Sequence, residues 1–339
     1  MLQRRSMKTL NNKTIFITGG TGSFGKAFVN LTLKKYKPKK IIIYSRDESK
    51  QWDMQQDYKN FKNIDFTIGD IRDFTNLNNT MRGVDCIVHA AATKIVPTAE
   101  TNPFECIKTN INGSMNVINA AINNNVQNVI ALSTDKACNP INLYGATKLA
   151  ADKLFVSGNL ENNTKSTKFS IVRYGNVIGS RGSVIPYFQS IASKHPKIPI
   201  TDLRMTRFII SLKECVEFVW MAFDEMQGGE IFVKKIPSIK ILDIANAISE
   251  KKNNYKLIGI RPGEKLHEEM ISIEDSFFTY EFKKFYKILP SILSKKKLSM
   301  MSKNGKRVKN NFSYKSNVNN NWISSMQLKK WLRKNPNFF

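Results

Sequence analysis

The glycine-rich segment Thr14–Gly25 (TIFITGGTGSFG) constrains the fold of this chain more than any other part of the sequence. Residues 14–18 are β-branched or aromatic, which favours a buried strand. Gly19, Gly22 and Gly25 follow at intervals of three residues. Glycines at this spacing permit a tight turn and let the backbone approach a pyrophosphate, which a following helix N-terminus attracts. The segment therefore predicts a dinucleotide-binding strand, turn and helix.

Strands and helices are expected to alternate through the first half of the chain. A helix should begin near Phe24, because Phe24, Phe28 and Leu31 are spaced by four and three residues. Further helices are expected at 112–124 and Tyr144–Phe155. Apolar runs predict further strands at Lys40–Tyr44, Ile64–Ile68, Val84–Ala92, Val126–Ser133 and Phe169–Tyr174. This alternation predicts an α/β fold with a doubly wound parallel sheet of the Rossmann type.

The second half of the chain is less regular. Residues 1–178 are expected to form the Rossmann domain. Segments rich in Gly, Pro and Arg then follow, so residues 179–339 are expected to form a smaller C-terminal lobe that binds substrate. A return to the main sheet is expected near 206–235, because Gly229–Val233 is apolar. A chain of 339 residues suits one large domain with a smaller lobe.

The net charge of 53 − 27 = +26 is compatible with nucleic acid, anionic lipid or a phosphorylated small molecule. The basic residues are scattered, and no helix-turn-helix, zinc-finger or RNA-recognition signature is present, so we expect no nucleic-acid partner. No apolar run approaches the roughly 20 residues of a membrane span, and the basic N-terminus lacks the apolar core of a signal peptide. A lysine-rich solvated surface is therefore the expected origin of the charge.

The cysteines and histidines show no metal-binding or disulfide pattern. The four cysteines lack C-x-x-C spacing, and the three histidines are far apart, so no metal is expected. Free thiols are typical of a reducing compartment, which predicts a cytoplasmic protein. The residues concerned are Cys86, Cys106, Cys138, Cys215, His89, His195 and His267.

The end of the second expected strand, Ser45-Arg46-Asp47, favours NADP over NAD. A hydroxyl and a guanidinium suit a ribose 2′-phosphate, which they bind through charge-assisted hydrogen bonds. Asp47 keeps NAD as an alternative cofactor, because an acid in this region can instead accept a hydrogen bond from a ribose hydroxyl. Asp70, after the third strand, is expected to meet the adenine.

Tyr144 and Lys148 are four residues apart, so they share one helix face. An ammonium beside a phenol is expected to lower the pKa of Tyr144 from about 10. A phenolate near a nicotinamide can accept a hydroxyl proton while hydride leaves for the ring. Upstream, Thr134-Asp135-Lys136 places a lysine where an acidic base is common in sugar-nucleotide dehydratases.

Motifs along almost the whole chain resemble the extended short-chain dehydrogenase/reductase superfamily, and more closely the inverting UDP-N-acetylglucosamine 4,6-dehydratases. The resemblance is carried by ITGGTGSFGK, YSRDE, GDIRD, STDKACNPINLYGATK, VRYGNVIGSRGSV, MTRF and IRPGEKLHE. The segment Ala92–Pro97 departs from the family pattern, which usually has Leu, Lys and then His or Gln. Lys94 is retained, but packing near the substrate is expected to differ.

The resemblance implies a reaction and a role for each central residue. Tyr144 takes the proton of the sugar 4-hydroxyl as hydride leaves C4 for NADP. Lys136 removes the C5 proton, Asp135 protonates the departing 6-hydroxyl, and Thr134 contacts a sugar hydroxyl or the ketone oxygen. Hydride then returns to C6, and C5 is reprotonated from the opposite face. Lys136 must be neutral to act as a base, and we expect Lys148, the oxidised nicotinamide and burial to lower its pKa.

The resemblance also implies the binding residues. The second half contains the candidate cations Arg181, Arg204, Arg207 and Arg261. Tyr314 and Asn319 are expected to close the site. The expected cofactor-binding residues are Gly19, Thr21, Gly22, Ser23, Phe24, Gly25, Ser45, Arg46, Asp47, Lys50, Asp70, Ile71, Ala90, Lys94, Tyr144 and Lys148. The expected substrate-binding residues are Lys94, Asn176, Val177, Arg207, Arg261 and Glu264.

Alternatives to this function remain open at the level of the residues. A retaining 4,6-dehydratase or a UDP-sugar 4-epimerase is the enzymatic alternative, because spacing does not decide the configuration at C5. A nucleotide-sensing protein that binds NADP is the non-enzymatic one. The resemblance further implies the first step of pseudaminic acid biosynthesis for flagellin or surface glycans. It implies homodimers built from helices at 103–124 and 144–158, assembled into a hexamer.

Overall fold

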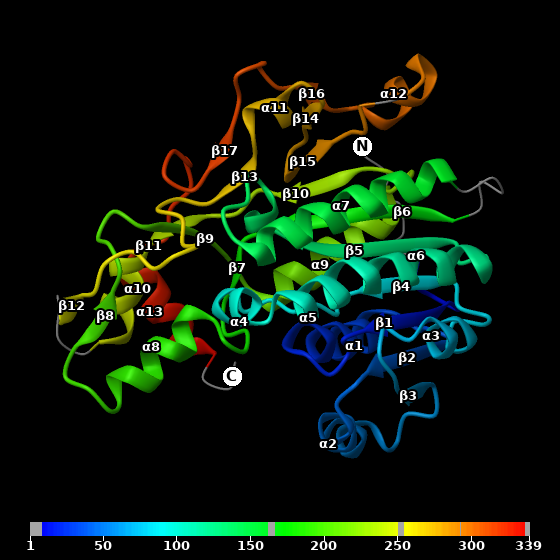
Figure 1. The fold of residues 1–339 in the computed structure, drawn as a ribbon, viewed down its shortest axis with the longest axis horizontal. Coiled ribbons are helices and arrows are strands. Elements are labelled where there is room, and N and C mark those ends of the chain that lie inside the picture. The colour runs from blue at the N-terminus through cyan, green and yellow to red at the C-terminus, as the bar shows by residue number, and fades with distance from the viewer. Residues whose placement is uncertain (1–8, 162–166, 250–253, 292, 336–339) are drawn as a thin grey trace.

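Figure 1 shows the computed structural model, which describes residues 9–161, 167–249, 254–291 and 293–335. The expectation that the N-terminus carries no signal-peptide core rests largely on residues 1–8, which lie outside the described residues. All four cysteines are buried and free of disulfides. Within the described residues, no helix combines the length and the apolar character that a bilayer-spanning segment needs.

Within the described residues, ten strands form one sheet in the order β16-β14-β15-β10-β6-β5-β4-β1-β2-β3. The strands from β10 to β3 pair in parallel, in the order of a doubly wound sheet, which confirms the expected fold class. The central β1 is buried along its whole length, which explains its continuous apolar sequence. The bounds are Thr14–Thr18 (β1), Lys40–Ser45 (β2), Ile64–Ile68 (β3), Cys86–His89 (β4), Asn128–Thr134 (β5), Lys168–Tyr174 (β6) and Ile231–Lys234 (β10).

β4 is shorter than the expected strand Val84–Ala92. Before it, the Asp85 N–H donates to the Thr14 carbonyl and the Asp85 carboxylate accepts from the Thr14 N–H, so the start of β4 is joined to the start of β1. After it, the N–H groups of Ala90 and Ala91 donate to the Thr18 hydroxyl, and the chain leaves the sheet. The strand therefore ends beside the glycine turn.

Helices cover both faces of the main sheet (Figure 1). On one face α3, α6 and α7 lie side by side, and on the other α1 packs against α9, where Trp220 donates to Thr32 and packs edge-on against Tyr36. A π-helical turn, Lys108–Asn112, precedes α6. The bounds are Ser23–Lys35 (α1), Glu48–Tyr58 (α2), Phe74–Thr80 (α3), Val96–Thr101 (α4), Pro103–Ile107 (α5), Gly113–Asn123 (α6), Leu143–Glu161 (α7) and Leu212–Glu225 (α9).

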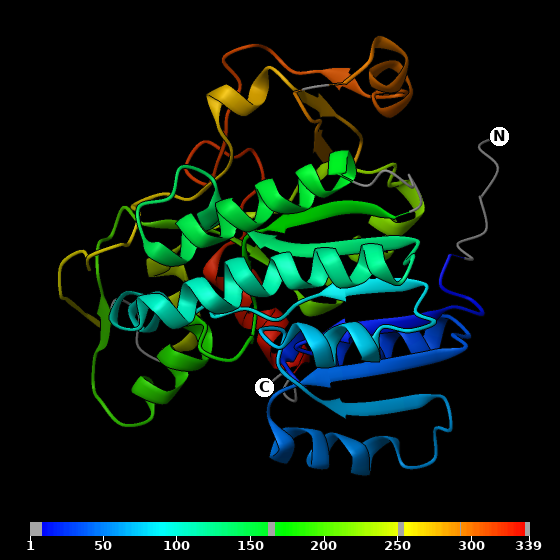
Figure 2. The same cartoon turned by 45° about the vertical axis from the view of Figure 1, so that its right-hand side comes forward.

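The second half returns to the main sheet twice. β10 joins β6 in parallel, and β15, β14 and β16 then extend the sheet in antiparallel pairing, at the end opposite β3 (Figure 2). The sequence did not predict the second return. The bounds of the strands involved are Thr279–Glu281 (β14), Phe285–Ile288 (β15) and Lys306–Arg307 (β16).

A smaller apolar core lies outside the main sheet. Buried residues of α8, α10 and α13 meet those of β8 and β9 there, with Ile185, Ile244 and Leu328 among the most buried. The remaining helices of the second half are Val184–Ala192 (α8), Ile241–Ile248 (α10), Ile273–Ser276 (α11), Lys295–Met301 (α12) and Ser325–Lys334 (α13). The remaining strands, in and outside this core, are Asn176–Val177 (β7), Ile198–Ile200 (β8), Thr206–Ile210 (β9), Ser238–Lys240 (β11), Tyr255–Leu257 (β12), Glu269–Ile271 (β13) and Tyr314–Lys315 (β17).

Candidate active site

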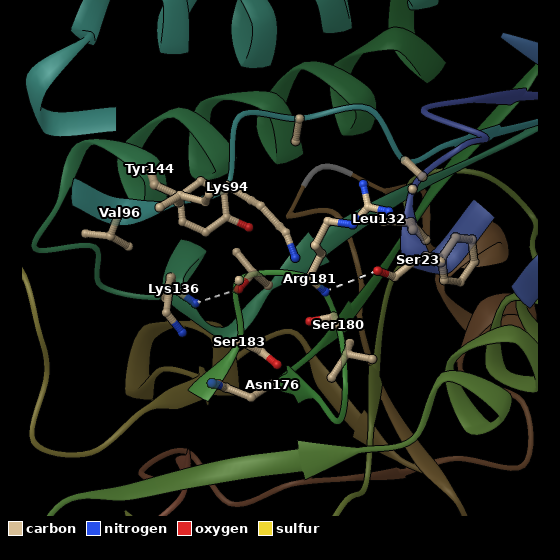
Figure 3. Close-up of a pocket in the computed structure, with 18 of the residues that line it drawn as sticks. Ser23, Lys94, Val96, Leu132, Lys136, Tyr144, Asn176, Ser180, Arg181 and Ser183 are labelled. Atoms are coloured by element: carbon tan, nitrogen blue, oxygen red, sulfur yellow. Dashed lines mark hydrogen bonds between the residues drawn. The ribbon is translucent and has the colours of Figure 1, made fainter. Parts of the chain in front are cut away.

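A cavity of about 1210 Å³ opens where the parallel strands end, between the main sheet and the smaller core (Figure 3). Ligands in open α/β sheets bind at this edge, beyond the carboxyl ends of the strands. All the predicted cofactor, catalytic and substrate residues line this one cavity. The structure therefore brings together side chains that are more than 200 residues apart in sequence, from Gly19 to Glu264.

The glycine turn fits a dinucleotide because the backbone leaves no room for side chains. Gly19 has φ +66°, and a Cβ there would lie 2.9 Å from Ala91 Cα. A Cβ on Gly25 would overlap the Gly20 carbonyl oxygen. No side chain caps α1 at Gly22, so the N–H groups of its first turn can meet a phosphate. This cradle would hold the pyrophosphate of a nicotinamide dinucleotide.

The end of β2 carries the groups expected to select the cofactor. Arg46 lies 3.6 Å from Asp70 in an exposed ion pair. Burial raises the pKa of Asp70, but hydrogen bonds from Arg72 outweigh it and hold that pKa below its ordinary value. Asp47 caps α2 by accepting from the Lys50 N–H, and its carboxylate pairs with the Lys50 ammonium. The carboxylate of Asp47 therefore already has a partner.

Tyr144 is the second residue of α7, which begins at Leu143, and its hydroxyl points toward the middle of the cavity (Figure 3). Burial raises the pKa of Tyr144 to about 12, although the charge of Lys136 and a hydrogen bond with Thr134 act against it. The expectation that Lys148 lowers this pKa is wrong for the protein without its cofactor. The Lys148 ammonium instead donates to the Leu132 carbonyl at 2.7 Å, and the cation that acts on Tyr144 is Lys136.

Lys136 and Asp135 form a short 3-10 turn, Asp135–Ala137, directly after β5. The Lys136 ammonium lies 3.0 Å from Asp135 Oδ1, and the Thr134 hydroxyl donates to the same oxygen at 3.0 Å. Asp135 is fully buried, and burial raises its pKa. The acid predicted beside the lysine is therefore in hydrogen-bond contact with it.

The expected lowering of the pKa of Lys136 is also wrong. Burial does lower it, but the charges of Asp135 and Glu268 outweigh burial and raise this pKa above its ordinary value. Sequence reasoning missed Glu268, whose Oε1 lies 3.1 Å from the Lys136 ammonium. Glu268 ends the IRPGEKLHE motif, in which only Arg261 and Glu264 had been assigned a place in the site.

The substrate side of the cavity is built from separate segments. Asn176 and Val177 form β7, and Arg207 lies on β9. The Arg207 guanidinium donates to the Thr206 carbonyl at 2.7 Å and lies 3.7 Å from Glu268 Oε1, so much of its bonding capacity is used within the protein.

Arg261 and Glu264 lie on a turn that lines the cavity. The Glu264 N–H donates to the Arg261 carbonyl, and the two side chains approach to 3.6 Å. Asn142, just before α7, donates to the Gly263 carbonyl at 2.8 Å. The turn is thereby tied to the helix that carries Tyr144.

Lys94 precedes α4, which begins at Val96, and its side chain extends into the cavity (Figure 3). Desolvation by the cavity wall and the charge of Arg181 lower the pKa of Lys94. Arg181 also lines the cavity, and its N–H donates to the Ser23 hydroxyl at 3.2 Å. A loop of the second half is thus linked to the glycine turn.

Two expected contacts are not made. The Tyr314 hydroxyl is buried and bonded to the backbone of Ile236, and Asn319 donates to the Ile236 carbonyl and the Ser238 hydroxyl. Neither residue lines the cavity. The expectation that they close the site is wrong, because both side chains form hydrogen bonds with the segment 236–238 instead.

Unpaired polar atoms are concentrated on the cavity wall. Among the residues that the structure describes, six buried side-chain atoms without a hydrogen-bond partner belong to cavity-lining residues: Thr109 Oγ1, Asp135 Oδ2, Asn176 Oδ1, Ser183 Oγ, Glu264 Oε2 and Glu268 Oε2. A buried polar atom without a partner costs about 1–3 kcal/mol. Their clustering indicates a cavity that binds a polar ligand.

Comparison with known proteins identifies a family and relatives that match most of this chain. The profile of a family described as Polysaccharide biosynthesis protein matches residues 15–290. A Campylobacter jejuni protein named UDP-N-acetylglucosamine 4,6-dehydratase (inverting) is 55% identical over 324 residues, which cover 94% of this chain and 96% of the relative. A Rickettsia akari protein named UDP-glucose 4-epimerase is 44% identical over 283 residues, 82% of this chain and 83% of the relative.

A solved structure extends the similarity to three dimensions. The X-ray structure of Pen from Bacillus thuringiensis has a TM-score of 0.88 and 36% identity, and the match covers 97% of this chain and 99% of Pen. The similarity therefore includes the C-terminal segments as well as the dinucleotide-binding part.

Proposed function

We propose that this chain, which belongs to the polysaccharide biosynthesis protein family, is a lyase that dehydrates UDP-N-acetylglucosamine with inversion at C5. The product is UDP-2-acetamido-2,6-dideoxy-beta-L-arabino-hex-4-ulose. The observation that carries the proposal is the meeting of Tyr144, Asp135 and Lys136 in one cavity beside the dinucleotide cradle. The chain shares 55% identity with a relative named for this reaction.

The residues divide the reaction between them. A bound nicotinamide dinucleotide supplies a reversible hydride acceptor for C4 and a hydride donor for C6. Tyr144 accepts the proton of the 4-hydroxyl, with Thr134 on the same cavity wall. The resulting ketone acidifies the C5 proton, which Lys136 removes. Asp135 protonates the departing 6-hydroxyl, and water leaves.

We propose NADP as the cofactor. Arg46 and Ser45 lie at the end of β2 on the cavity wall, where a guanidinium and a hydroxyl suit a 2′-phosphate. Asp47, the residue that favours NAD as an alternative cofactor, already accepts a hydrogen bond from the Lys50 N–H as the N-cap of α2. Residues 1–178, with the return near 206–235, would hold this cofactor, and residues 179–339 would hold the UDP-sugar through Arg207, Arg261 and Glu264. Asn176 and Val177, just before the boundary, and Lys94 would also bind the UDP-sugar.

The cellular setting is proposed on the same basis. Four free, buried thiols suit a reducing compartment, so we place the enzyme in the cytoplasm. We propose a homodimer built from the helices at 103–124 and 144–158, assembled further into a hexamer. Exposed Phe104, Ile107 and Met115 on the first of these segments support this interface. Light scattering would test the oligomeric state.

The pathway proposed is pseudaminic acid biosynthesis, in which this dehydration is the first step.

A 4-epimerase is the second candidate, because a relative with that name is 44% identical to the chain. An epimerase also needs a tyrosine and a nicotinamide, but it breaks no C5–H or C6–O bond. The Asp135–Lys136 pair, buried beside Tyr144, would then have no chemical task. This pair favours the dehydratase.

One experiment separates the candidates. The purified protein is incubated with NADP and UDP-N-acetylglucosamine in D₂O, and the product is analysed by mass spectrometry and NMR. We expect loss of one water, deuterium at C5 and inverted configuration there. An unchanged mass with inversion at C4 identifies an epimerase, and retention at C5 identifies a retaining dehydratase. Binding of NADP without turnover identifies a nucleotide-sensing protein.

A further inference from the structure

Lys136 is held between two carboxylates. Its ammonium lies 3.0 Å from Asp135 Oδ1 and 3.1 Å from Glu268 Oε1. Asp135 and Glu268 are both buried, and one oxygen of each, Asp135 Oδ2 and Glu268 Oε2, is buried without a hydrogen-bond partner. The scheme proposed above uses Asp135 and Lys136, but it gives Glu268 no task.

The position of Glu268 is fixed by contacts with two other chain segments. Its N–H donates to the Ser316 hydroxyl at 2.9 Å, and the Ser316 N–H donates to the Glu268 carbonyl at 2.8 Å. The Ser316 hydroxyl is also 2.7 Å from that of Thr206 on β9. Arg207, the next residue on β9, lies 3.7 Å from Glu268 Oε1. The carboxylate is therefore pre-organised beside Lys136 rather than resting on a flexible side chain.

Dehydration needs a neutral lysine and a protonated aspartic acid at the same time. The resting charges, an ammonium at Lys136 and carboxylates at Asp135 and Glu268, sum to −1. Moving one proton from Lys136 Nζ to Asp135 Oδ1, along their existing hydrogen bond, gives the required pair without changing this sum. Such a transfer needs no exchange with solvent.

Asp135 and Glu268 differ in the charges that surround them. Arg207 is always charged and favours the anionic form of Glu268. Burial and the charge of Glu268 both raise the pKa of Asp135, whereas Lys136 and Arg207 outweigh burial and lower the pKa of Glu268. Lys265 adds a further positive charge acting on Glu268. Once Lys136 is neutral, two buried anions would face each other, so the proton is retained on Asp135.

We propose that Glu268 is a positioning residue for the dehydration step, a fixed anion that holds the Lys136 amine and directs its proton to Asp135. This inference rests on the proposed function. An N–H bond of Lys136 breaks and an O–H bond forms on Asp135. The C5–H bond then breaks, its proton goes to Lys136, and its electron pair forms the C5–C6 double bond. The C6–O bond breaks, its oxygen takes the Asp135 proton, and both side chains regain their resting charges.

The test compares Glu268→Gln and Glu268→Asp with Glu269→Gln. Glu269 is the neighbouring acid, but it pairs with Lys315 and Asn139 and does not line the cavity. C4 oxidation is followed in single turnovers by the absorbance of the reduced nicotinamide, and dehydration by loss of water and deuterium uptake at C5. We expect Glu268→Gln to keep C4 oxidation and slow dehydration about 10- to 100-fold. Glu268→Asp, which keeps the charge, should dehydrate faster than Glu268→Gln.

Thermal unfolding of each variant identifies a folding defect. The ratio of the rates of C4 oxidation and dehydration is then measured only on folded protein. Dehydration by Glu268→Gln within about twofold of the wild type overturns the proposal. So does an equal loss of both steps, or equal dehydration rates for the Gln and Asp variants. A wild-type protein that never releases water from UDP-N-acetylglucosamine refutes the proposed function itself, so the two failures are distinguishable.

Discussion

Arg46 Nη1 lies 3.6 Å from Asp70 Oδ2, so a cation at the end of β2 meets an acid that follows β3 at the edge of the cavity. The Arg46 side chain remains more than half exposed, and an exposed ion pair of this length contributes little to stability. Asp70 is satisfied by Arg72 without it. The guanidinium can therefore turn toward a ligand phosphate at small cost.

Cofactor choice should depend on Arg46. We expect Arg46→Ala to weaken NADP binding by about 10- to 100-fold, because a charge-assisted phosphate contact is lost. NAD binding should change by less than about threefold, since NAD lacks that phosphate. Fluorescence titration with both dinucleotides measures the difference, and Arg82→Ala, on the surface after α3, is the control. Equal weakening for both dinucleotides would show that Arg46 does not select the phosphate.

The glycine cradle predicts a cofactor-binding defect at Gly25. An added Cβ would overlap the Gly20 carbonyl, and backbone cannot move aside as a flexible side chain can. We expect Gly25→Ala to displace α1 from the turn and weaken binding of either dinucleotide by at least about tenfold. Asn30→Ala, an exposed position on the same helix, should leave binding unchanged. Wild-type affinity in Gly25→Ala would mean that the turn is looser than its geometry indicates.

Lys136 provides the sharpest test of the reaction. Lys136→Ala removes the proposed C5 base, so deuterium uptake at C5 and loss of water should fall by more than about 100-fold. C4 oxidation should be affected much less than dehydration, because Tyr144 remains, although its pKa rises when the Lys136 charge is lost. NADP should stay bound. The measurement is the single-turnover assay described for Glu268, and near wild-type release of water would exclude Lys136 as the base.

Local patterns predicted the Rossmann part of the fold and the wall of the cavity. β1 has the expected bounds, because a buried parallel strand is a continuous apolar run flanked by turns. β3, which is only partly buried, also has the expected bounds and ends just before Gly69-Asp70. The glycine turn, Tyr144 and Asp135 all follow strands or begin helices at one edge of the sheet. Their shared cavity follows from topology once the strand order is known.

The electrostatics of the site could not be predicted in the same way. Burial raises the pKa of Tyr144, whereas the charges of Asp135 and Glu268 outweigh burial and raise the pKa of Lys136. The approach of Glu268 to Lys136 depends on the contacts of Ser316 with β9. No local pattern encodes a contact between segments so far apart in sequence. The antiparallel extension by β15 and β14 escaped prediction for a related reason: strands of four and three residues carry too little periodicity.

His89 predicts how stability depends on pH. The ring is buried at the end of β4, where its Nδ1 lies 2.8 Å from the Thr18 hydroxyl. Burial, with the charge of Lys148, lowers its pKa from 6.5 to about 3. The folded protein therefore keeps His89 neutral where the unfolded chain binds a proton. Its contribution to stability is complete above pH 6.5 and falls by about 1.4 kcal/mol per pH unit as the pH drops toward 3.

The variant His89→Gln isolates this contribution. It removes the titrating ring, so its free energy of unfolding should fall less steeply below pH 6.5 than that of the wild type. Urea unfolding at several pH values between 7.5 and 4.5 measures both slopes, and the comparison at the highest pH gives the packing loss alone. The difference in stability between the two proteins should shrink by about 1.4 kcal/mol for each pH unit below 6. Parallel curves would mean that His89 is protonated inside the folded protein, and then the buried contact with Thr18 would have to accommodate an imidazolium.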